Sequence, residues 1–407
     1  MKKCGLLGRK LGHSYSPQIH SMLSDYEYKL YEKEPEELES FLRDSGLDGL
    51  NVTIPYKKSV IPFCDELSDI AKSIGSVNTL VRRADGSLFG DNTDAFGFES
   101  LLKRSGIDPA GRKALVLGSG GASVTVCAVL KSLGAGEVLT VSRSGEVNYG
   151  NLHLHADAEL IVNTTPLGMY PNNGEKALDL RDFPACRGVL DVVYNPARTA
   201  LLLQAEELGI PCAGGLHMLV AQAKRSSEEF AGVSIPDSEI DRIEAVLRAQ
   251  LQNIVIIGMP GSGKTSVSEL LGSRLGRRVV DTDAEIVARA GMSIPEIFEG
   301  FGEEHFRALE TEVMADVGRQ GGLIISTGGG CVTRRENYPL LHQNGTVFWL
   351  LRDPGLLPKD GRPISQKSDL KELFLRRKPM YEAFADVRID NNGSLEAAAA
   401  AITEALK

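Results

Sequence analysis

The stretch GMPGSGKT, at residues 258–265, decides the fold of the C-terminal part of the chain. It fits the pattern GxxxxGK[ST], in which glycines keep side chains away from a loop whose backbone amides face phosphate oxygens. The apolar run NIVIIG leads into it and a helical pattern follows. We therefore expect a strand, a phosphate-binding loop and a helix whose positive dipole end points toward the anion. A chance glycine loop is the alternative.

Within this loop Lys264 supplies a point charge, and the Thr265 hydroxyl is suited to Mg²⁺. The nucleotide-binding residues that we expect are Gly258, Met259, Pro260, Gly261, Ser262, Gly263, Lys264, Thr265 and Ser266. One helix later comes VVDTDAEI, at residues 279–286. Because strand side chains alternate, this pattern predicts that Asp281 and Asp283 lie on the same side of an extended segment, where two carboxylates can take different roles.

Outward from this loop, short apolar runs alternate with helical patterns through most of the chain, which is an α/β signature with largely parallel sheets. With 407 residues the chain is too long for one core. We expect two domains: residues 1–250, with a substrate lobe (1–100), a Rossmann-type dinucleotide lobe (101–215) and returning helices (216–250), and residues 251–407, a P-loop domain. A helix over 238–251 leads directly into NIVIIG, so no flexible linker separates the domains.

The composition excludes several classes of function. A net charge of -9 argues against a general nucleic-acid surface, and no run approaches the roughly 18 apolar residues of a membrane span. The six cysteines lack any CxxC pair and no secretory leader precedes them, so we expect buried thiols and a cytoplasmic protein. His153 and His155 alternate as on a strand, and no further ligands support a metal site there.

A second glycine pattern, GSGGAS at residues 118–123, stands between a strand and a helix, as in a pyrophosphate site. Ser123 occupies the third fingerprint position, so a merely tight turn is the alternative. The next strand, EVLTV, ends in SRS (142–144). Arg143 suits the 2′-phosphate of NADP, whereas the neighbouring Glu146 keeps NAD open.

Four patterns upstream are dense in hydroxyls and amides beside Lys57 and Asp94, as a site for a polyhydroxylated ring would be: GHSYSP (12–17), NVTIPYK (51–57), GSVNT (75–79) and GDNTDAFGF (90–98). Three more follow in order: VNTTPLGM (162–169), DVVYNP (191–196) and GGLHMLVAQA (214–223). Through roughly residue 230 the chain resembles shikimate dehydrogenase.

This resemblance implies that Lys57 and Asp94 form the central catalytic dyad, with Lys57 stabilising and protonating the alkoxide that develops from a ketone. Without the motif, Lys57 would read as a solvated lysine beside Lys58. The implied substrate-binding residues are Ser14, Ser16, Thr53, Lys57, Asn78, Asp94, Tyr194 and Gln222. The implied NADP(H)-binding residues are Gly118, Ser119, Gly120, Gly121, Ala122, Ser123, Ser142, Arg143, Ser144, Thr164, Gly215 and Met218. We expect His217 to crowd the cofactor, and we interpret His13 and His20 as structural.

In the C-terminal part the motifs GEEHFRALE (302–310), STGGG (326–330), GRPI (361–364) and RRKPMY (376–381) join the phosphate loop. Over residues 251–407 the chain resembles shikimate kinase. The resemblance implies that Thr265 and Asp281 hold Mg²⁺ and that Asp283 binds the substrate hydroxyl and acts as its base. The other implied residues are Arg307 and Arg377 for the substrate carboxylate, Gly328, Gly329 and Gly330 for the ring, and the lid residue Arg362 for the transferred phosphoryl group. The alternative for the arginines is pairing with surface acids such as Glu310.

One departure from the kinase pattern is a short lid between LLRDP and GRPI, which lacks the additional arginine expected near adenine. Arg352 is a candidate replacement. Because lid closure excludes water from the phosphoryl group, the short lid bears on turnover and ATP affinity.

The resemblances together imply a bifunctional enzyme of the shikimate pathway, which leads to the aromatic amino acids. It would reduce 3-dehydroshikimate with NADPH and phosphorylate the resulting shikimate with ATP and Mg²⁺. Two alternatives stay open: a dehydrogenase that prefers quinate, and a kinase-like half that binds nucleotide as a regulatory module without useful turnover.

Overall fold

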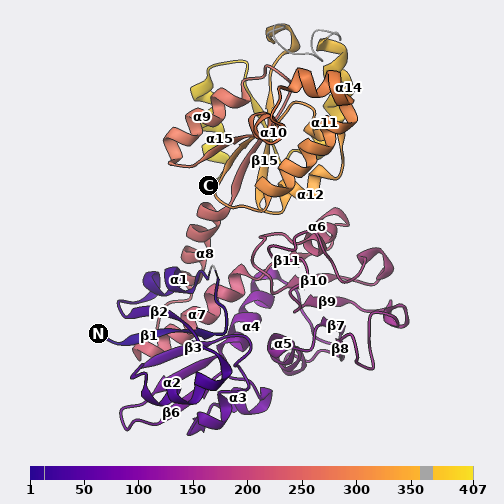
Figure 1. Ribbon diagram of the computed structural model, residues 1–407. Coiled ribbons are helices and arrows are strands. Elements are labelled where there is room, and N and C mark those ends of the chain that lie inside the picture. The colour runs from indigo at the N-terminus through magenta and orange to yellow at the C-terminus, as the bar shows by residue number, and fades with distance from the viewer. Residues whose placement is uncertain (13, 358–369, 407) are drawn as a thin grey trace. The chain divides into compact units, whose positions relative to one another are not determined.

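The structure is a computed structural model that describes residues 1–12, 14–357 and 370–406. The chain divides into two compact units, which we treat separately: Met1–Met169 with Glu175–Val246, and Leu247–Lys407 with Tyr170–Gly174. The N-terminal and C-terminal units meet inside helix α8 (Ser238–Leu251). As predicted, α8 leads directly into strand β12 (Asn253–Ile257) (Figure 1).

The N-terminal unit begins with a mixed six-stranded sheet in the order β2-β1-β3-β5-β6-β4. Its strands are β1 (Lys3–Gly8), β2 (Glu27–Glu32), β3 (Gly49–Val52), β4 (Glu66–Leu67), β5 (Thr79–Arg82) and β6 (Leu88–Asp91). The helices of this lobe are α1 (Ser16–Leu23), α2 (Leu38–Asp44) and α3 (Asp69–Ile74). Three of the five pairings in this sheet are parallel, in agreement with the expectation of largely parallel sheets. β5 pairs antiparallel with β3 and with β6, and a short turn over residues 83–87 joins β5 to β6 as a hairpin.

The second lobe of this unit carries a fully parallel five-stranded sheet in the order β11-β10-β9-β7-β8. Its strands are β7 (Lys113–Leu117), β8 (Glu137–Val141), β9 (Leu160–Asn163), β10 (Gly188–Asp191) and β11 (Cys212–Ala213). Helices α4 (Thr93–Ser105), α5 (Gly121–Ser132) and α6 (Ala200–Glu207) pack against it. Alternate residues of β7 enter two cores: Ala114 and Val116 pack with α4 and α5, whereas Leu115 and Leu117 pack with α6. Burial on both faces explains why these strands read as continuous apolar runs.

Helix α7 (Leu216–Ala231) returns the chain to the first lobe and packs against α4 and α1. The crossing of α4 and α7 is close at Gly97, where an added Cβ would lie 2.7 Å from the Met218 carbonyl oxygen. Since α4 begins at Thr93 and α7 at Leu216, this contact brings the first turns of two helices that carry predicted site residues close together. The predicted returning helices over residues 216–250 are therefore α7 and α8.

The C-terminal unit is a parallel five-stranded sheet in the order β13-β14-β12-β15-β16. The strands after β12 are β13 (Val279–Asp281), β14 (Ile324–Ser326), β15 (Gly345–Leu351) and β16 (Val387–Asp390). The helices are α9 (Lys264–Leu275), α10 (Thr282–Ala290), α11 (Ile294–Gly318), α12 (Asn337–His342), α14 (Leu370–Phe384) and α15 (Leu395–Ala405). The predicted terminal helix with the alanine run is α15.

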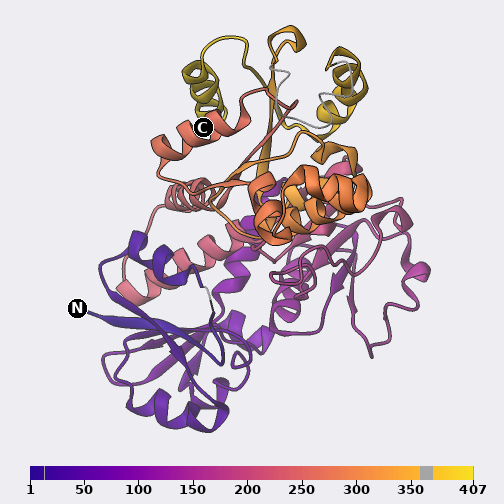
Figure 2. The ribbon, with the colours of Figure 1, turned by 45° about the horizontal axis from the view of Figure 1, so that its top comes forward.

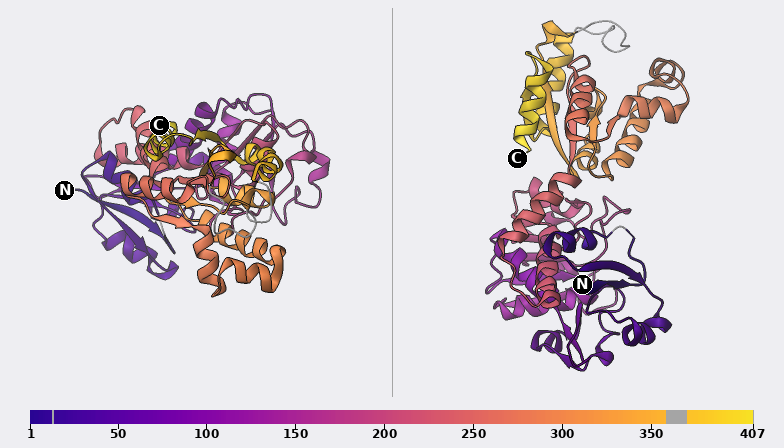
Figure 3. Two further views of the ribbon diagram at one scale, coloured as in Figure 1. Left: turned by 90° about the horizontal axis from the view of Figure 1, so that it is seen from above. Right: turned by 90° about the vertical axis from the view of Figure 1, so that its left-hand side faces the viewer.

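Alternate residues of β12 again serve two cores. Ile254 and Ile256 pack with α9 and α15 on one face of the sheet, and Figure 3 shows these two helices side by side. Val255 and Ile257 face the other core, which is built mainly from α11, α12 and α14. Helix α11 lies toward the viewer in Figure 2. The loop that follows β12 therefore emerges from a strand buried on both sides, which holds its start in a fixed place.

Three local expectations need correction. β13 ends at Asp281 and α10 begins at Thr282, so Asp281 and Asp283 do not share an extended segment: Asp281 caps α10 and Asp283 lies in its first turn. His153 and His155 lie in a 3-10 turn (Leu152–His155) and not on a strand. Of the six cysteines only Cys4 and Cys331 are buried, and the other four are partly exposed.

Across the described helices, none combines the length and apolar character that a membrane crossing requires.

Candidate active sites

The N-terminal unit has a pocket at the meeting of its two lobes. It is lined by all eight of the predicted substrate-binding residues: Ser14, Ser16, Thr53, Lys57, Asn78, Asp94, Tyr194 and Gln222. Gly215, Met218 and Ala122 line the same pocket, so the first turns of α7 and α5 border it. Residues separated by more than 200 positions in the chain thus face one cavity.

Lys57 and Asp94 form an ion pair inside this pocket. Nζ of Lys57 lies 2.5 Å from Oδ2 of Asp94, and the two side chains are only 16% and 11% exposed. Asp94 is held because α4 starts at Thr93, whose backbone N–H donates to Oδ1 of Asn78 (2.7 Å). A largely enclosed lysine with a carboxylate partner is not the solvated lysine of the alternative interpretation, and it can present a proton to an oxygen in the pocket.

Neutral donors surround the dyad. Burial raises the pKa of Tyr194, so its hydroxyl keeps its proton near neutral pH and can donate a hydrogen bond. The ring of Tyr194 lies 5.6 Å from that of Tyr15, centroid to centroid, which fixes its direction. Ser16 is buried, and its backbone N–H donates to Oγ of Ser14 (3.2 Å). The pocket therefore combines one charged dyad with several hydroxyl and amide groups, as the recognition of a polyhydroxylated ring requires.

Sequence reasoning missed Asn51, which also lines this pocket. Its Oδ1 accepts from the Tyr28 hydroxyl (2.7 Å) and its Nδ2 donates to Oγ1 of Thr79 (3.3 Å). The available signal was its spacing from Thr53, two positions away in NVTIPYK, because residues two apart on an extended segment point the same way.

The residues expected to hold a dinucleotide fit such a ligand. Gly118 has φ of +109° and an added Cβ would meet Oγ1 of Thr164 at 2.8 Å, so only glycine suits this turn. Gly120 caps α5 with open space around it and no side chain occupies the cap, which leaves the first amides of the helix for an anion. Arg143 is exposed just after β8, where a 2′-phosphate would bind.

Other predicted cofactor residues have different surroundings. Ser123 is 1% exposed, so its side chain packs inward and only its backbone remains for a ligand. Oγ1 of Thr164 donates to the Leu117 carbonyl (2.6 Å), which closes the turn next to Gly118. Ser119, Ser142 and Ser144 are partly or fully exposed beside the glycine turn and after β8.

The expectation for His217 is wrong. Its ring points away from the pocket: Nε2 lies 2.8 Å from Oγ of Ser100 on α4, and Nδ1 lies 2.7 Å from Oε2 of Glu244 on α8. His20 is structural as predicted, because it is 1% exposed and stacks on Tyr28 with ring centroids 4.0 Å apart. His13 lies outside the described residues.

The C-terminal unit has a second cavity, of about 410 Å³, beside its phosphate loop. This volume is within the roughly 300–1,000 Å³ typical of small-molecule sites. Its lining includes every described residue that we expected for the second substrate and the metal: Thr265, Asp281, Asp283, Arg307, Gly328, Gly329, Gly330 and Arg377. Arg362 and the lid motif that carries it lie outside the described residues.

The phosphate loop has the backbone that its glycines predict. Gly258, Gly261 and Gly263 have φ of +151°, +84° and +93°, and α9 begins directly after the last of them. Nζ of Lys264 donates to the carbonyls of Gly258 (3.0 Å) and Met259 (3.1 Å), so its charge lies over the loop. Ser262 is buried, and its carbonyl accepts from Nδ2 of Asn391 (2.7 Å), a brace that sequence reasoning missed.

The groups expected at the metal are already adjacent. The Thr265 hydroxyl donates to Oδ2 of Asp281 (3.1 Å), while Oδ1 of Asp281 accepts from the backbone N–H groups of Asp283 and Ala284. A hydroxyl and a carboxylate oxygen beside a phosphate loop are the hard oxygen ligands that Mg²⁺ prefers, so the residues present fit this ion.

Three consecutive glycines bring charged side chains close to the cavity. A Cβ at Gly328 would lie 2.6 Å from Oδ1 of Asp283, and one at Gly330 would lie 2.2 Å from Nη2 of Arg307. Arg377 donates through Nη1 to the Gly329 carbonyl (3.0 Å). These contacts explain why side chains are excluded from 328–330, and they gather one carboxylate and two guanidinium groups around one space.

Glu310 is not the surface acid assumed in the alternative interpretation. It is completely buried and accepts from Nη1 of Arg307 (2.6 Å). Burial raises the pKa of Glu310 while Arg307 opposes this effect. Burial by itself lowers the pKa of Arg307, but Glu310 and Glu303 more than compensate and raise it. Glu310 therefore holds a buried, charged Arg307 at the cavity wall, where an acidic substrate can pair with it.

Comparisons with known proteins give separate matches for the N-terminal and C-terminal units. A family model described as shikimate dehydrogenase substrate binding domain matches residues 6–80. Shikimate dehydrogenase (NADP(+)) of Clostridium perfringens strain SM101 is 35% identical over 271 residues, which cover 61% of this chain and 100% of that protein. The chain belongs to the shikimate dehydrogenase family.

Solved structures resemble the dehydrogenase-family unit. Shikimate 5-dehydrogenase from Thermus thermophilus in complex with NADP(H) and shikimate is 30% identical with a TM-score of 0.55, covering 60% of this chain and 98% of that one. Quinate dehydrogenase from Corynebacterium glutamicum in complex with NAD is 27% identical with a TM-score of 0.55, covering 60% and 98%.

The C-terminal unit matches a different family. A family model described as shikimate kinase matches residues 260–407, which include the phosphate loop from Pro260 onward and the whole lining of the second cavity. The chain thus joins a unit of the shikimate dehydrogenase family to a unit that matches the shikimate kinase family model, in agreement with the two sequence resemblances. Its α/β fold class is confirmed.

Proposed function

We propose that this chain is a bifunctional enzyme that reduces 3-dehydroshikimate to shikimate with NADPH and phosphorylates shikimate to shikimate 3-phosphate with ATP. The observation that carries the proposal is the Lys57–Asp94 ion pair, which shares one pocket with the first turn of α5, where no side chain occupies the cap. In the second cavity, Asp283 and two arginines beside a phosphate loop support the kinase assignment. NADP is also the cofactor in the name of the Clostridium relative.

The proposed reduction needs a proton at the atom that becomes an alkoxide. NADPH supplies the hydride when bound. Lys57 donates a proton to the substrate oxygen, while Asp94, 2.5 Å from Nζ, holds the ammonium in place. Ser14, Ser16 and Tyr194 bind the carboxylate and hydroxyls of the ring. Preference for NADPH over NADH follows from Arg143, which can bind the additional phosphate.

The proposed phosphoryl transfer depends mainly on positioning and charge neutralisation. Mg²⁺, held by Thr265 and Asp281, would neutralise phosphate oxygens. Lys264 and the amides of the loop bind the phosphates, and Arg307 and Arg377 bind the carboxylate of shikimate. Asp283 accepts the proton of the hydroxyl that attacks the phosphoryl group. The arginines suit an anionic acceptor that must be held near a highly charged nucleotide.

The decisive experiment incubates the purified chain with 3-dehydroshikimate, NADPH, ATP and Mg²⁺ and follows NADPH loss together with shikimate 3-phosphate. We expect NADPH loss without ATP, and phosphorylated product only when ATP is present. Absence of shikimate 3-phosphate would refute the bifunctional proposal.

Two further arms distinguish the alternatives. Parallel oxidation of shikimate and quinate with NADP⁺ and NAD⁺ measures specificity, and a clear preference for quinate would overturn the substrate assignment. ADP release in the presence and absence of shikimate measures turnover at the second site. Tight ATP binding without shikimate-dependent ADP release would favour a regulatory nucleotide module.

A further inference from the structure

Three side chains from α4, α7 and α8 form a largely buried hydrogen-bonded chain that neither proposed reaction uses. Nε2 of His217 lies 2.8 Å from Oγ of Ser100, and Nδ1 of His217 lies 2.7 Å from Oε2 of Glu244. The side chains of His217 and Glu244 are 7% and 6% exposed. Three helices of the dehydrogenase-family unit are therefore tied together at one point.

The direction of these hydrogen bonds follows from the chemistry of the groups. An ionised Glu244 carboxylate can only accept hydrogen bonds, so Nδ1 of His217 carries the hydrogen atom and donates the hydrogen bond to Glu244. In the neutral ring Nε2 then accepts from the Ser100 hydroxyl. The His217–Glu244 contact is buried and the Ser100–His217 contact is partly buried. Removal of one partner leaves the other polar group unmatched, which makes the arrangement costly to disturb.

The hydrogen-bonded residues Ser100, His217 and Glu244 lie directly behind the residues assigned to the nicotinamide. His217 precedes Met218 in the first turn of α7, and Met218 and Gln222 line the pocket. Ser100 lies on α4, which carries Asp94 near its start. His217 thus links α4, which carries Asp94, to α7, which carries Met218, on the side of α7 away from the pocket.

We propose that the Ser100–His217–Glu244 chain positions the nicotinamide side of the dehydrogenase site against the Lys57–Asp94 dyad, with His217 and Glu244 as positioning residues for hydride transfer. This inference rests on the proposed reduction.

Two other interpretations of the cluster are weaker. Asp241 lies within 4.8 Å of His217 and Glu244, as a metal site would require. However, Nη1 of Arg104 lies 2.8 Å from Oδ1 of Asp241, so the Asp241 carboxylate already pairs with a cationic side chain. The order Ser, His, Glu is also that of a nucleophile, a base and an orienting acid. Ser100 lies inside α4, whose amides are used within the helix, and it lines neither of the two substrate pockets.

The test uses the full chain and the variants His217→Ala, Glu244→Ala and Glu244→Gln. We expect the two alanine variants to lower kcat for 3-dehydroshikimate reduction about tenfold, because small displacements of the reacting atoms are costly. KM for 3-dehydroshikimate should stay within about threefold of the wild-type value. The kinetic isotope effect with NADPH deuterated at the transferred position should change, because hydride transfer itself is displaced. Glu244→Gln should restore kcat, since its amide oxygen accepts from Nδ1 of His217.

Glu239→Gln is the matched control, because Glu239 lies on the same helix in an exposed pair with Arg242. Wild-type kcat and isotope effect in His217→Ala would overturn the inference. So would a lower melting temperature with an unchanged isotope effect, which would mean a purely structural role. Labelling of Ser100 by a fluorophosphonate, or a Zn²⁺ requirement removed by Asp241→Asn, would overturn it in favour of the other interpretations. An inactive wild-type chain would instead refute the proposed reduction, and the inference with it.

Discussion

At the scale of single residues, the two candidate sites use charge in different ways. In the dehydrogenase pocket one ammonium and one carboxylate neutralise each other, and the remaining contacts are hydroxyls and amides. In the kinase-family cavity Arg307 and Arg377 face the space with Asp283, and the buried Glu310 compensates Arg307 from behind. Both sites suit a small acid, but only the second must hold it beside phosphates.

Replacement of Lys57 tests the dyad. Lys57→Ala removes the proton donor, so we expect kcat for 3-dehydroshikimate reduction to fall by about 100- to 10,000-fold, the range typical of general acids. Shikimate-dependent ADP release should remain unchanged. Lys57→Arg, which keeps the charge but not the compact ammonium, should recover little activity. Substantial reductase activity in Lys57→Ala, measured by NADPH absorbance, would contradict the assignment.

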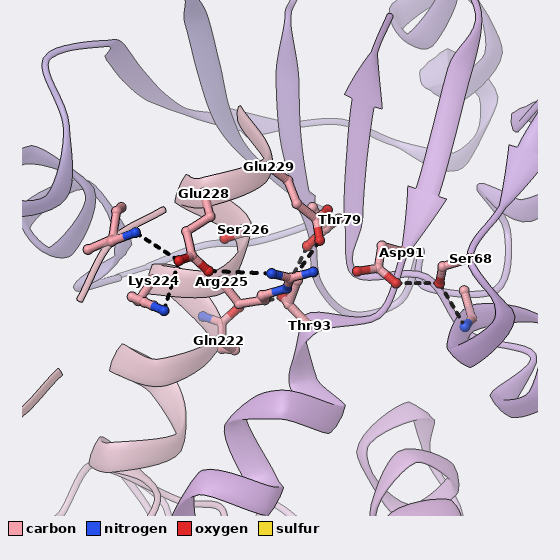
Figure 4. Close-up of polar contacts among 12 residues, drawn as sticks. Ser68, Thr79, Asp91, Thr93, Gln222, Lys224, Arg225, Ser226, Glu228 and Glu229 are labelled. Atoms are coloured by element: carbon pink, nitrogen blue, oxygen red, sulfur yellow. Dashed lines mark hydrogen bonds and ion pairs between the residues drawn. The ribbon is translucent and has the colours of Figure 1, made fainter. Parts of the chain in front are cut away.

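A carboxyl group outside both sites predicts a pH dependence of stability. Glu229 on α7 faces Asp91, and Nε of Arg225 lies 3.5 Å from its Oε1 (Figure 4). Burial, together with the hydrogen bond and charge of Asp91, raises the pKa of Glu229 to about 9. Between about pH 4.5 and 9 the folded chain keeps a proton that the unfolded chain releases, so stability falls as pH rises through this window.

Glu229→Gln cannot release this proton. We therefore expect the variant to gain stability relative to wild type as pH rises, by an amount on the order of a few kcal/mol at pH 9. Melting curves of the dehydrogenase-family unit at pH 5, 7 and 9 measure the difference. Glu228→Gln is the matched neighbour. Burial opposes ionisation of Glu228, but the Ile235 N–H and Lys224 lower its pKa. That variant should therefore lose stability at all three pH values. A difference in melting temperature between Glu229→Gln and wild type that does not depend on pH would be inconsistent with a proton held on Glu229.

At the scale of elements, the crossing of α4 and α7 positions the dehydrogenase site. Both helices bring their first turns to the pocket, and they approach closely because Gly97 has no side chain. The loop after β12 has an equivalent position in the kinase-family unit, where a strand buried on both faces ends at the phosphate loop. In each unit the packed framework sets the site and the loops supply the contacts.

Gly97→Ala tests this crossing. The new Cβ would lie 2.7 Å from the Met218 carbonyl and 3.1 Å from Cβ of Gln222, so the helices must separate. We expect a loss of about 1–3 kcal/mol of stability, typical of overpacking, and a clear loss of reductase activity. Gly300→Ala, in the helix α11, has open space and should be neutral. Equal melting temperatures and reductase rates for the two variants would argue against the close crossing.

At the scale of the whole molecule, the chain joins two units that each contain their own pocket, core and sheet. The continuous helix α8 spans the junction, and no loop separates it from β12 beyond Gln252. Fusion therefore fixes a one-to-one ratio of the two proposed active sites. It also allows each to be removed without the other.

Lys264→Ala tests this independence. Loss of the loop charge should lower shikimate-dependent ADP release by about 100-fold or more, the scale of other preorganised charge contacts. NADPH oxidation with 3-dehydroshikimate should stay at the wild-type rate, the reverse of Lys57→Ala. A mixture of the two variants should again form shikimate 3-phosphate from 3-dehydroshikimate. Loss of both activities in either variant would contradict independent sites.

Local sequence determined much of this protein. The strand, loop and helix around residues 258–265 and the direct passage from α8 into β12 were predictable, because backbone conformation, amide exposure and apolar periodicity are encoded within a few residues. The gathering of Lys57 and Asp94 with the hydroxyl motifs was implied by the resemblance to shikimate dehydrogenase and not by a local pattern.

Only the tertiary structure decided which way several side chains point. His217 turns toward Glu244, and Glu310 is buried behind Arg307. Asn51 and Asn391 belong to the two sites through residues far away in the chain. The β5–β6 hairpin made the first sheet mixed. The physical reason is common to all of these: a side chain's partner is chosen by the packing of distant elements, and no local pattern records which element will lie opposite.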